Sequence, residues 1–261
     1  MWRLRALAAT LALTATVATA AKAAQTVKLS TSFQPDRLGA STTILYSFQV
    51  DGTRGALPSA VTDIDLHLPA GMGLATSTLG LATCEPSVLL RRGPAGCPAN
   101  ARVGYGSALV QVPFAEEVVQ ESASIVAMFG PPEEEHLIVL FYVEGVSPIY
   151  AQLVFPGAVL PDSGAFGERL DTGIPVIPAV PEGPDVAVVH FTSTIGPRNL
   201  TYYRRIRGKN VPFQPRGIAV PQSCPHGGFP FAADFAFADG THTHAKSTVP
   251  CPRASAGRRG G

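Results

Sequence analysis

The chain has 261 residues, a formal net charge of +1 and a hydrophobic fraction of 46%. Because charged residues make up only 15% of it, the composition excludes a strongly charged polypeptide and indicates no nucleic-acid partner. A chain of this length and composition is expected to bury a sizeable apolar core, as one large all-β domain or two small ones.

The first residues have the features of an export signal. A positive start, Trp2-Arg3-Leu4-Arg5, precedes an apolar run over 6–18 and small-residue cleavage sites at Ala18-Thr19-Ala20 and Ala21-Lys22-Ala23. We expect residues 1–23 to be a cleaved signal peptide, and no later stretch approaches the roughly 20 apolar residues of a membrane span. The expected localisation is secreted or cell-surface associated.

Alternation of apolar and polar residues with a period of two predicts β-strands along most of the remaining chain. Such runs cover 27–33, 44–50, 64–68, 101–114, 118–129, 149–155, 186–195 and 200–207. The run 137–143 is apolar throughout, which is typical of a central strand covered on both faces. In the run that starts at Ala101, small residues occupy one face (Gly104, Gly106, Ala108), and we expect this face to lie close to another layer.

Four cysteines in an exported chain indicate two disulfides, and proximity in the sequence favours Cys84 with Cys97 and Cys224 with Cys251. The alternative is a four-cysteine zinc site, but its ligands usually come in C-x2-4-C pairs, which neither spacing matches. Between the first two cysteines, Pro86 suits a first helical turn that Gly93-Pro94 would end. One short helical turn is therefore expected inside a disulfide-closed loop.

Pro and Gly are abundant between residues 161 and 184, and each Pro removes a donor from a strand ladder. We expect a long surface connection here, or a seam near 160–185 between two parts of the fold.

The dipeptide Asp239-Gly240 lies between two strand patterns, 229–238 and 241–249, and predicts a hairpin. In its first strand the rings of Phe229, Phe231, Phe235 and Phe237 share one face, which we expect in the core. A two-residue turn would place His242 and His244 on that aromatic face, whereas a three-residue bulged loop would place them on the other. We favour the bulged loop.

Many short strands separated by turn signals predict a mostly antiparallel β-sandwich, of the jelly-roll or Ig-like kind, over residues 24–252. Residues 253–261 are expected to be a disordered tail.

Two histidine-containing strand patterns are weak candidates for metal binding. Asp63, Asp65 and His67 share one strand face, but alternate residues stand roughly 7 Å apart, too far for all three to reach one ion. His242 and His244 have the same spacing. We interpret the first set as a solvated strand face and predict no metal, no cofactor and no catalytic residue, since the sequence contains none of the common hydrolase, zincin or nucleotide-binding motifs.

One dense basic cluster, 202–209, is the candidate ligand-binding segment, because Arg forks bind carboxylates and phosphates and Tyr rings stack on sugars. A cell-wall or extracellular glycan is the candidate partner. The alternative is a charged edge strand that resists aggregation, since in a strand the cluster is divided between two faces. The candidate ligand-binding residues are Tyr202, Tyr203, Arg204, Arg205 and Arg207.

Several short motifs give the chain a resemblance to a protein family. They are Leu68-Pro69-Ala70-Gly71, 79–84, Cys97-Pro98-Ala99, 103–108, 224–231 and Cys251-Pro252. This LPxG, C...CP and VGxGxA pattern resembles that of uncharacterised exported β-rich proteins of GC-rich Gram-positive bacteria. The resemblance covers about half the mature chain and implies no activity, so it assigns no functional residues.

The sequence therefore favours a secreted, non-catalytic structural or binding module of the cell envelope or extracellular space. The alternative is a carbohydrate-active enzyme or glycan-binding protein on a jelly-roll sandwich, with acids drawn from distant loops.

Overall fold

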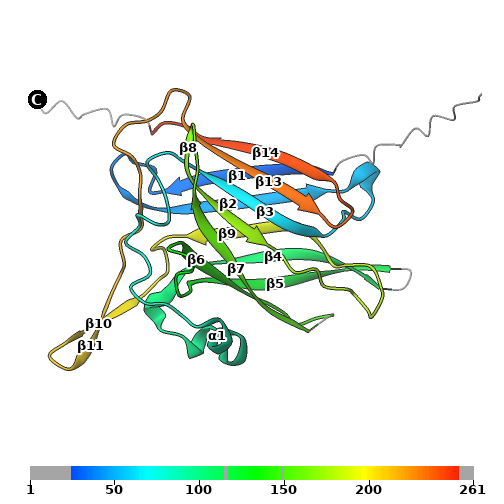
Figure 1. The fold of residues 1–261 in the computed structure, drawn as a ribbon, viewed down its shortest axis with the longest axis horizontal. Coiled ribbons are helices and arrows are strands. Elements are labelled where there is room, and N and C mark those ends of the chain that lie inside the picture. The colour runs from blue at the N-terminus through cyan, green and yellow to red at the C-terminus, as the bar shows by residue number, and fades with distance from the viewer. Residues whose placement is uncertain (1–24, 115–116, 149, 253–261) are drawn as a thin grey trace, which may run out of the picture.

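The computed structural model describes residues 25–114, 117–148 and 150–252 (Figure 1), so the expected signal peptide and tail lie outside the described residues. The strands are β1 (Thr26–Gln34), β2 (Ser41–Asp51), β3 (Val61–Pro69), β4 (Arg102–Phe114), β5 (Glu117–Phe129), β6 (Leu137–Gly145), β7 (Ala151–Pro161), β8 (Phe166–Gly173), β9 (Ala187–Ile195), β10 (Tyr202–Ile206), β11 (Lys209–Phe213), β12 (Ile218–Ala219), β13 (Phe229–Phe237) and β14 (His242–Val249). The described helical elements are α1 (Pro86–Arg92) and the 3-10 segments η1 (Thr53–Gly55), η2 (Pro94–Gly96) and η3 (Ala99–Ala101).

All pairings between the named strands are antiparallel, as predicted, and most of the strands belong to one continuous sheet. Its order is β1-β2-β9-β4-β5-β6-β7-β8-β3-β13-β14, with β12 added to β2, while β10 and β11 form a separate hairpin. The sheet curls into an upper and a lower half (Figure 1). The predicted sandwich is not confirmed, because a sandwich has two separate sheets and here β2–β9 and β8–β3 pairing joins the two halves.

The two edge strands, β1 and β14, lie side by side and nearly close the sheet into a barrel. Side chains bridge them: the Thr31 amide donates to Ser247 Oγ at 3.2 Å, and Thr243 Oγ1 donates to the Gln25 carbonyl at 2.6 Å. An exposed edge is a site for unwanted strand addition, and near-closure removes most of it.

The strand β8 was missed by the sequence analysis, since it lies within the segment expected to be a surface connection. Its sequence, FGERLDTG, has a weak alternation with glycine near both ends, and pairing with β7 and β3 holds it in the sheet. The Pro-rich part that follows, 174–186, is a connection between β8 and β9, as expected.

A packed cluster fills one end of the barrel. Inward side chains near that end, such as Phe33, Leu68 and Phe229, meet Met72 and Leu79 from the connection that follows β3. This end is closed by apolar packing.

The cysteine-closed excursion covers part of the outer surface. Cys84 and Cys97 are joined, with Cα atoms 5.4 Å apart, and Cys224 is joined to Cys251 at 5.8 Å, so both predicted disulfides are confirmed. The predicted helical turn is α1, whose Leu89 is fully buried against the outer face of β6. This explains the unbroken apolar run of β6, which is covered on both faces as predicted.

The C-terminal hairpin has the bulged loop that the sequence favoured. His242 pairs with Ala236 and His244 with Asp234, so both histidines lie on the outer face. The four phenylalanines of β13 are all at most 3% exposed and face the barrel interior.

Candidate functional site

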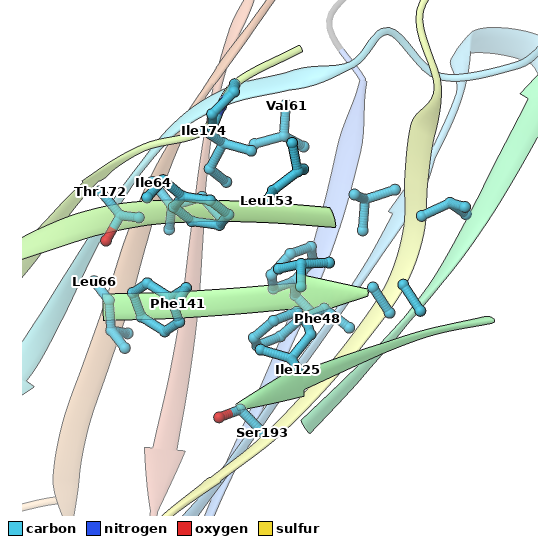
Figure 2. A pocket seen from close by; sticks show the side chains of 18 of the residues that line it. Phe48, Val61, Ile64, Leu66, Ile125, Phe141, Leu153, Thr172, Ile174 and Ser193 are labelled. Carbon is cyan, nitrogen blue, oxygen red and sulfur yellow. The ribbon is translucent and has the colours of Figure 1, made fainter. Parts of the chain in front are cut away.

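An apolar cavity of about 200 Å³ lies inside the barrel (Figure 2). Its walls come from both halves of the sheet, with Phe48 and Phe191 on one side and Phe141 and Leu153 on the other. Two ring pairs, Phe48 with Phe191 and Phe141 with Phe155, are stacked at centroid distances of 5.0 and 5.5 Å. The walls are therefore fixed by aromatic contacts.

Small residues on neighbouring strands create the space. Ala108 on β4 pairs with Ala123 on β5, and Gly145 on β6 pairs with Ala151 on β7, and all four line the cavity. The other side chains that line the cavity do not reach far enough over these small residues to fill the interior, so a void remains. We expected the small face of β4 to lie against another layer, and at Ala108 it borders empty space instead.

The Pro-rich connection between β8 and β9 lines the cavity at the end opposite the packed cluster. Ile174, Val176 and Ile177 contribute to the wall, and the Ile174 amide donates to the Thr62 carbonyl at 2.8 Å. Val176 is also 45% exposed to solvent, so at this segment the cavity comes close to the protein surface.

Four polar side chains are among the lining residues: Tyr46, Glu121, Thr172 and Ser193. Glu121 Oε1 accepts a hydrogen bond from the Ser147 amide at 2.9 Å. The Tyr46 hydroxyl is buried and has no hydrogen-bond partner among the described residues. Burial raises the pKa of Tyr46 well above its usual value, so the phenol is neutral. Leaving such a group unpaired costs roughly 1–3 kcal/mol, and this cost calls for an explanation.

The outer face of β3 carries a row of carboxylates, because the register pairs Asp65 with Asp171 on β8 and with Asp234 on β13. Partial burial, followed by the charge of Asp171, raises the pKa of both Asp63 and Asp65. Arg169 Nε lies 3.4 Å from Asp65 Oδ1 and lowers this repulsion. In the part of the chain that the structure describes, no group of three or more His, Cys, Asp or Glu residues is placed to hold a metal ion.

His67 links this row to a neighbouring loop. Its Nδ1 lies 2.6 Å from Asp162 Oδ2 and its Nε2 lies 3.0 Å from Asp234 Oδ2. Partial burial by itself lowers the pKa of His67, but the two carboxylates outweigh it and hold the pKa above its usual value. Our interpretation of this face as merely solvated is wrong for His67, whose side chain is 17% exposed.

The structure places the predicted ligand-binding residues on the β10–β11 hairpin, which projects from the barrel (Figure 1). Tyr202 is fully buried at its base, and its hydroxyl donates to the Arg102 carbonyl at 2.6 Å and accepts from the Gly80 amide at 3.0 Å. Tyr203, Arg204, Arg205 and Arg207 are exposed. The hairpin therefore presents one tyrosine and three arginines to solvent, and Tyr202 serves packing.

The cavity itself was missed by the sequence analysis. The sequence feature that could have indicated it is the set of Gly and Ala residues that face the interior and pair with one another on β4 to β7. This feature is visible only once the register of those strands is known. His67 was identified, but its two carboxylate partners come from β13 and from the loop before β8, far away in the sequence.

No family model matches the chain, and no curated protein or solved structure is significantly similar to it. None of the helices in the described residues is long and apolar enough to cross a membrane.

Proposed function

We propose that the chain is a secreted, non-catalytic binding module whose barrel interior holds a small apolar ligand. The observation that carries this proposal is the cavity of about 200 Å³, walled largely by hydrocarbon and aromatic side chains from both halves of the sheet. A protein interior normally leaves few voids larger than a water molecule. A void of this size between rigid walls is the usual form of a site for an apolar guest.

The size of the cavity sets the size of the ligand. An engineered apolar cavity of roughly 150 Å³ stays dry and binds benzene. A cavity of about 200 Å³ therefore suits a single substituted ring or a short hydrocarbon chain.

A titration with toluene, followed by amide NMR spectra, tests the proposal. We expect shifts confined to residues around the cavity, and their loss in Ala123→Leu, which fills the space. Ala219→Leu adds the same side chain at an exposed position of β12 and is the matched control. Unchanged spectra at saturating toluene, or equal binding by Ala123→Leu, would contradict the proposal.

Secretion is part of the proposal and rests on the export signal and the two disulfides, since oxidising compartments favour disulfides. Mass spectrometry of exported protein should find an N-terminus between Ala21 and Gln25. An intact Met1 on exported protein would contradict this step.

A second candidate function, binding of an anionic cell-wall or extracellular glycan, is favoured by the charge of the β10–β11 hairpin. Residues 186–233 contain Arg198, Arg204, Arg205, Arg207, Lys209 and Arg216 but no Asp or Glu. Arg204 is positioned over the Phe213 ring, with its guanidinium carbon 5.6 Å from the centroid. The hairpin therefore offers an uncompensated positive surface.

Retention on a heparin column separates a dedicated site from general charge. Changing the three exposed hairpin arginines to Ser should lower the eluting salt concentration more than changing Arg54, Arg91 and Arg92, which are exposed elsewhere. Equal loss in the two triple variants would mean that the hairpin has no special role.

A carbohydrate-active enzyme is the alternative that the sequence left open. Glycoside hydrolysis usually needs two carboxylates across a cleft, and among the described residues that line the cavity Glu121 is the single carboxylate. The cavity thus favours an apolar guest over a sugar. Release of sugar from a panel of polysaccharides would favour the enzyme, and capture on a glycan array without release would favour binding.

A further inference from the structure

The end of the barrel opposite the packed cluster, which we call the cavity end, carries most of the exposed apolar side chains. Neighbouring strands from β4 to β8 are all antiparallel, so β4, β6 and β8 run toward this end and the connections that follow them lie there (Figure 1). Ten large apolar or aromatic side chains are exposed among the described residues, and six of them lie on or beside these three connections. We call these six the apolar tips: Phe114, Val118, Val146, Tyr150, Val176 and Val180.

The β4–β5 hairpin extends past the neighbouring strands at the cavity end. Phe114 lies on the inward face of β4, in phase with Val110 of the cavity wall, and yet it is 55% exposed. Val118 lies on the outward face of β5, out of phase with Glu121 of the cavity wall, and is also exposed. A hairpin exposes both faces of its strands where it projects from a sheet, so these two side chains protrude from the barrel.

A hydrogen bond ties the β6–β7 connection to the neighbouring strand. The Ser147 amide donates to Glu121 Oε1 on β5 at 2.9 Å, and Val146 and Tyr150 are both exposed. The Tyr150 hydroxyl donates to Gln152 Oε1 at 3.2 Å. This connection therefore presents one aliphatic and one aromatic side chain beside the β4–β5 hairpin.

The β8–β9 connection forms a short arm of its own. The Val186 amide donates to the Ile177 carbonyl and the Gly183 amide to the Val180 carbonyl, both at 2.8 Å, so Val180 lies at the turn of the arm. Val176, at the base of the arm, lines the cavity and is also exposed. The apolar tips are therefore continuous with the apolar wall of the cavity.

The charge around the apolar tips indicates what they contact. Residues 113–121, 144–151 and 174–187 contain no Lys, Arg or His, and Glu117 and Glu182 are exposed there. Two copies of the chain that met through these tips would bring like charges together, and an anionic lipid surface would repel them. A zwitterionic phospholipid surface has its ammonium groups outermost, which suits carboxylates placed around apolar side chains.

We propose that the cavity end of the barrel docks on a zwitterionic lipid surface through the apolar tips. Side chains on separate protruding connections can each enter the headgroup region, where burial of apolar area drives binding. Tyrosine is favoured at this depth because its ring is apolar and its hydroxyl is polar. Docked in this way, the cavity faces the lipid, and an apolar ligand passes between the two without crossing water. This last step rests on the proposed apolar-ligand function, whereas docking itself does not.

Co-flotation with phosphatidylcholine vesicles, without any cavity ligand, measures docking. The tip variant replaces one side chain on each connection: Phe114→Ser, Val146→Ser and Val180→Ser. The control variant removes three side chains outside these connections, of similar exposure (42–62% against 41–68%): Leu81→Ser, Leu90→Ser and Ile206→Ser. Melting curves show whether both variants are folded.

We expect the wild-type protein to float with the vesicles and the tip variant to partition roughly tenfold more weakly, because three apolar side chains no longer leave water. The control variant should partition like the wild type. Replacing half of the lipid with anionic phosphatidylglycerol should weaken binding of the wild type, since the exposed carboxylates are repelled.

Fluorescence locates the lipid contact independently of the serine variants. Tyr150→Trp and Tyr203→Trp each place an indole at an exposed tyrosine position, the first at the cavity end and the second on the β10–β11 hairpin. Phosphatidylcholine with brominated acyl chains should quench the emission that the first substitution adds and leave that of the second unchanged.

Wild-type protein that stays in the lipid-free fraction would overturn the inference, even if toluene binds in the cavity. Equal loss of binding in the two triple variants, or equal quenching at positions 150 and 203, would also overturn it. Stronger binding to anionic vesicles would mean that the basic hairpin faces the lipid instead. A wild-type dimer in sedimentation that the tip variant abolishes would mean that a second copy covers the tips. Docking without toluene binding would support the inference and contradict only the apolar-ligand function.

Discussion

A larger side chain on β5 that fills the cavity should stabilise the protein. This is an unusual outcome for a small-to-large substitution inside a folded domain. Ala123 is 7% exposed and borders the cavity. Ala123→Leu adds three carbons, and at about 0.8 kcal/mol for each buried carbon the gain is about 2 kcal/mol if the side chain enters empty space. For a domain of this size the melting temperature should rise by roughly 4–8 °C.

The control comes from the same strand and the same face. Ala127 lies four residues further along β5, is 1% exposed, and belongs to the packed cluster that fills the other end of the barrel. It does not line the cavity. Ala127→Leu must displace its neighbours and should destabilise the protein by about 1–3 kcal/mol.

Calorimetric melting and urea unfolding of the two variants measure these effects, and their opposite signs are the diagnostic result. If Ala123→Leu destabilises the protein as much as Ala127→Leu does, the interior at β5 is fully packed and the reasoning from the cavity is refuted. If both variants stabilise it, the packed end has more free space than the structure shows.

Two further predictions concern the covalent clamp and the ion pairs. Replacing both Cys224 and Cys251 with Ser should lower the free energy of unfolding by about 3.5 kcal/mol, from the loop entropy of a 27-residue separation, and a non-reducing peptide map should still show the other disulfide. Partial burial raises the pKa of Asp162 and Asp234, but their hydrogen bonds to histidine outweigh it, so both pKa values are lowered. The two carboxylates therefore stabilise the folded state above roughly pH 4, and this stabilisation is lost as the pH falls further. The raised pKa of His67 adds stability that is fully present below roughly pH 6.5 and fades as pH rises through the raised value. His67→Gln should therefore cost most between about pH 4 and 6.5 in urea titrations, and a loss that is the same at pH 9 would contradict this account.

Local chemistry in the sequence was sufficient for most of the elements and for their covalent links. Period-two alternation predicts β1, β2 and β13, because one face of each strand meets the core. Pro86 and Gly93 delimit α1, since Pro suits the first turn of a helix and Gly93 adopts a φ of 61° where the helix ends. The disulfide pairs follow from short separations in the chain, and the bulged hairpin loop follows from the need to keep the histidines out of the aromatic face.

Only the tertiary structure decided how the strands meet, and the cavity depends on that. Alternation shows which residues share a face, but it does not show which strands are neighbours or which edges come together. The near-closed barrel depends on pairing between β2 and β9 and between β3 and β8, segments about 100 residues or more apart in the chain. The pairing of β2, β9, β4 and β5 places Ala108 and Ala123 beside the stacked rings of Phe48 and Phe191, and the Tyr46 hydroxyl is left without a hydrogen-bond partner among the described residues. A void is a property of several strands at once, since it exists only where distant side chains fail to meet.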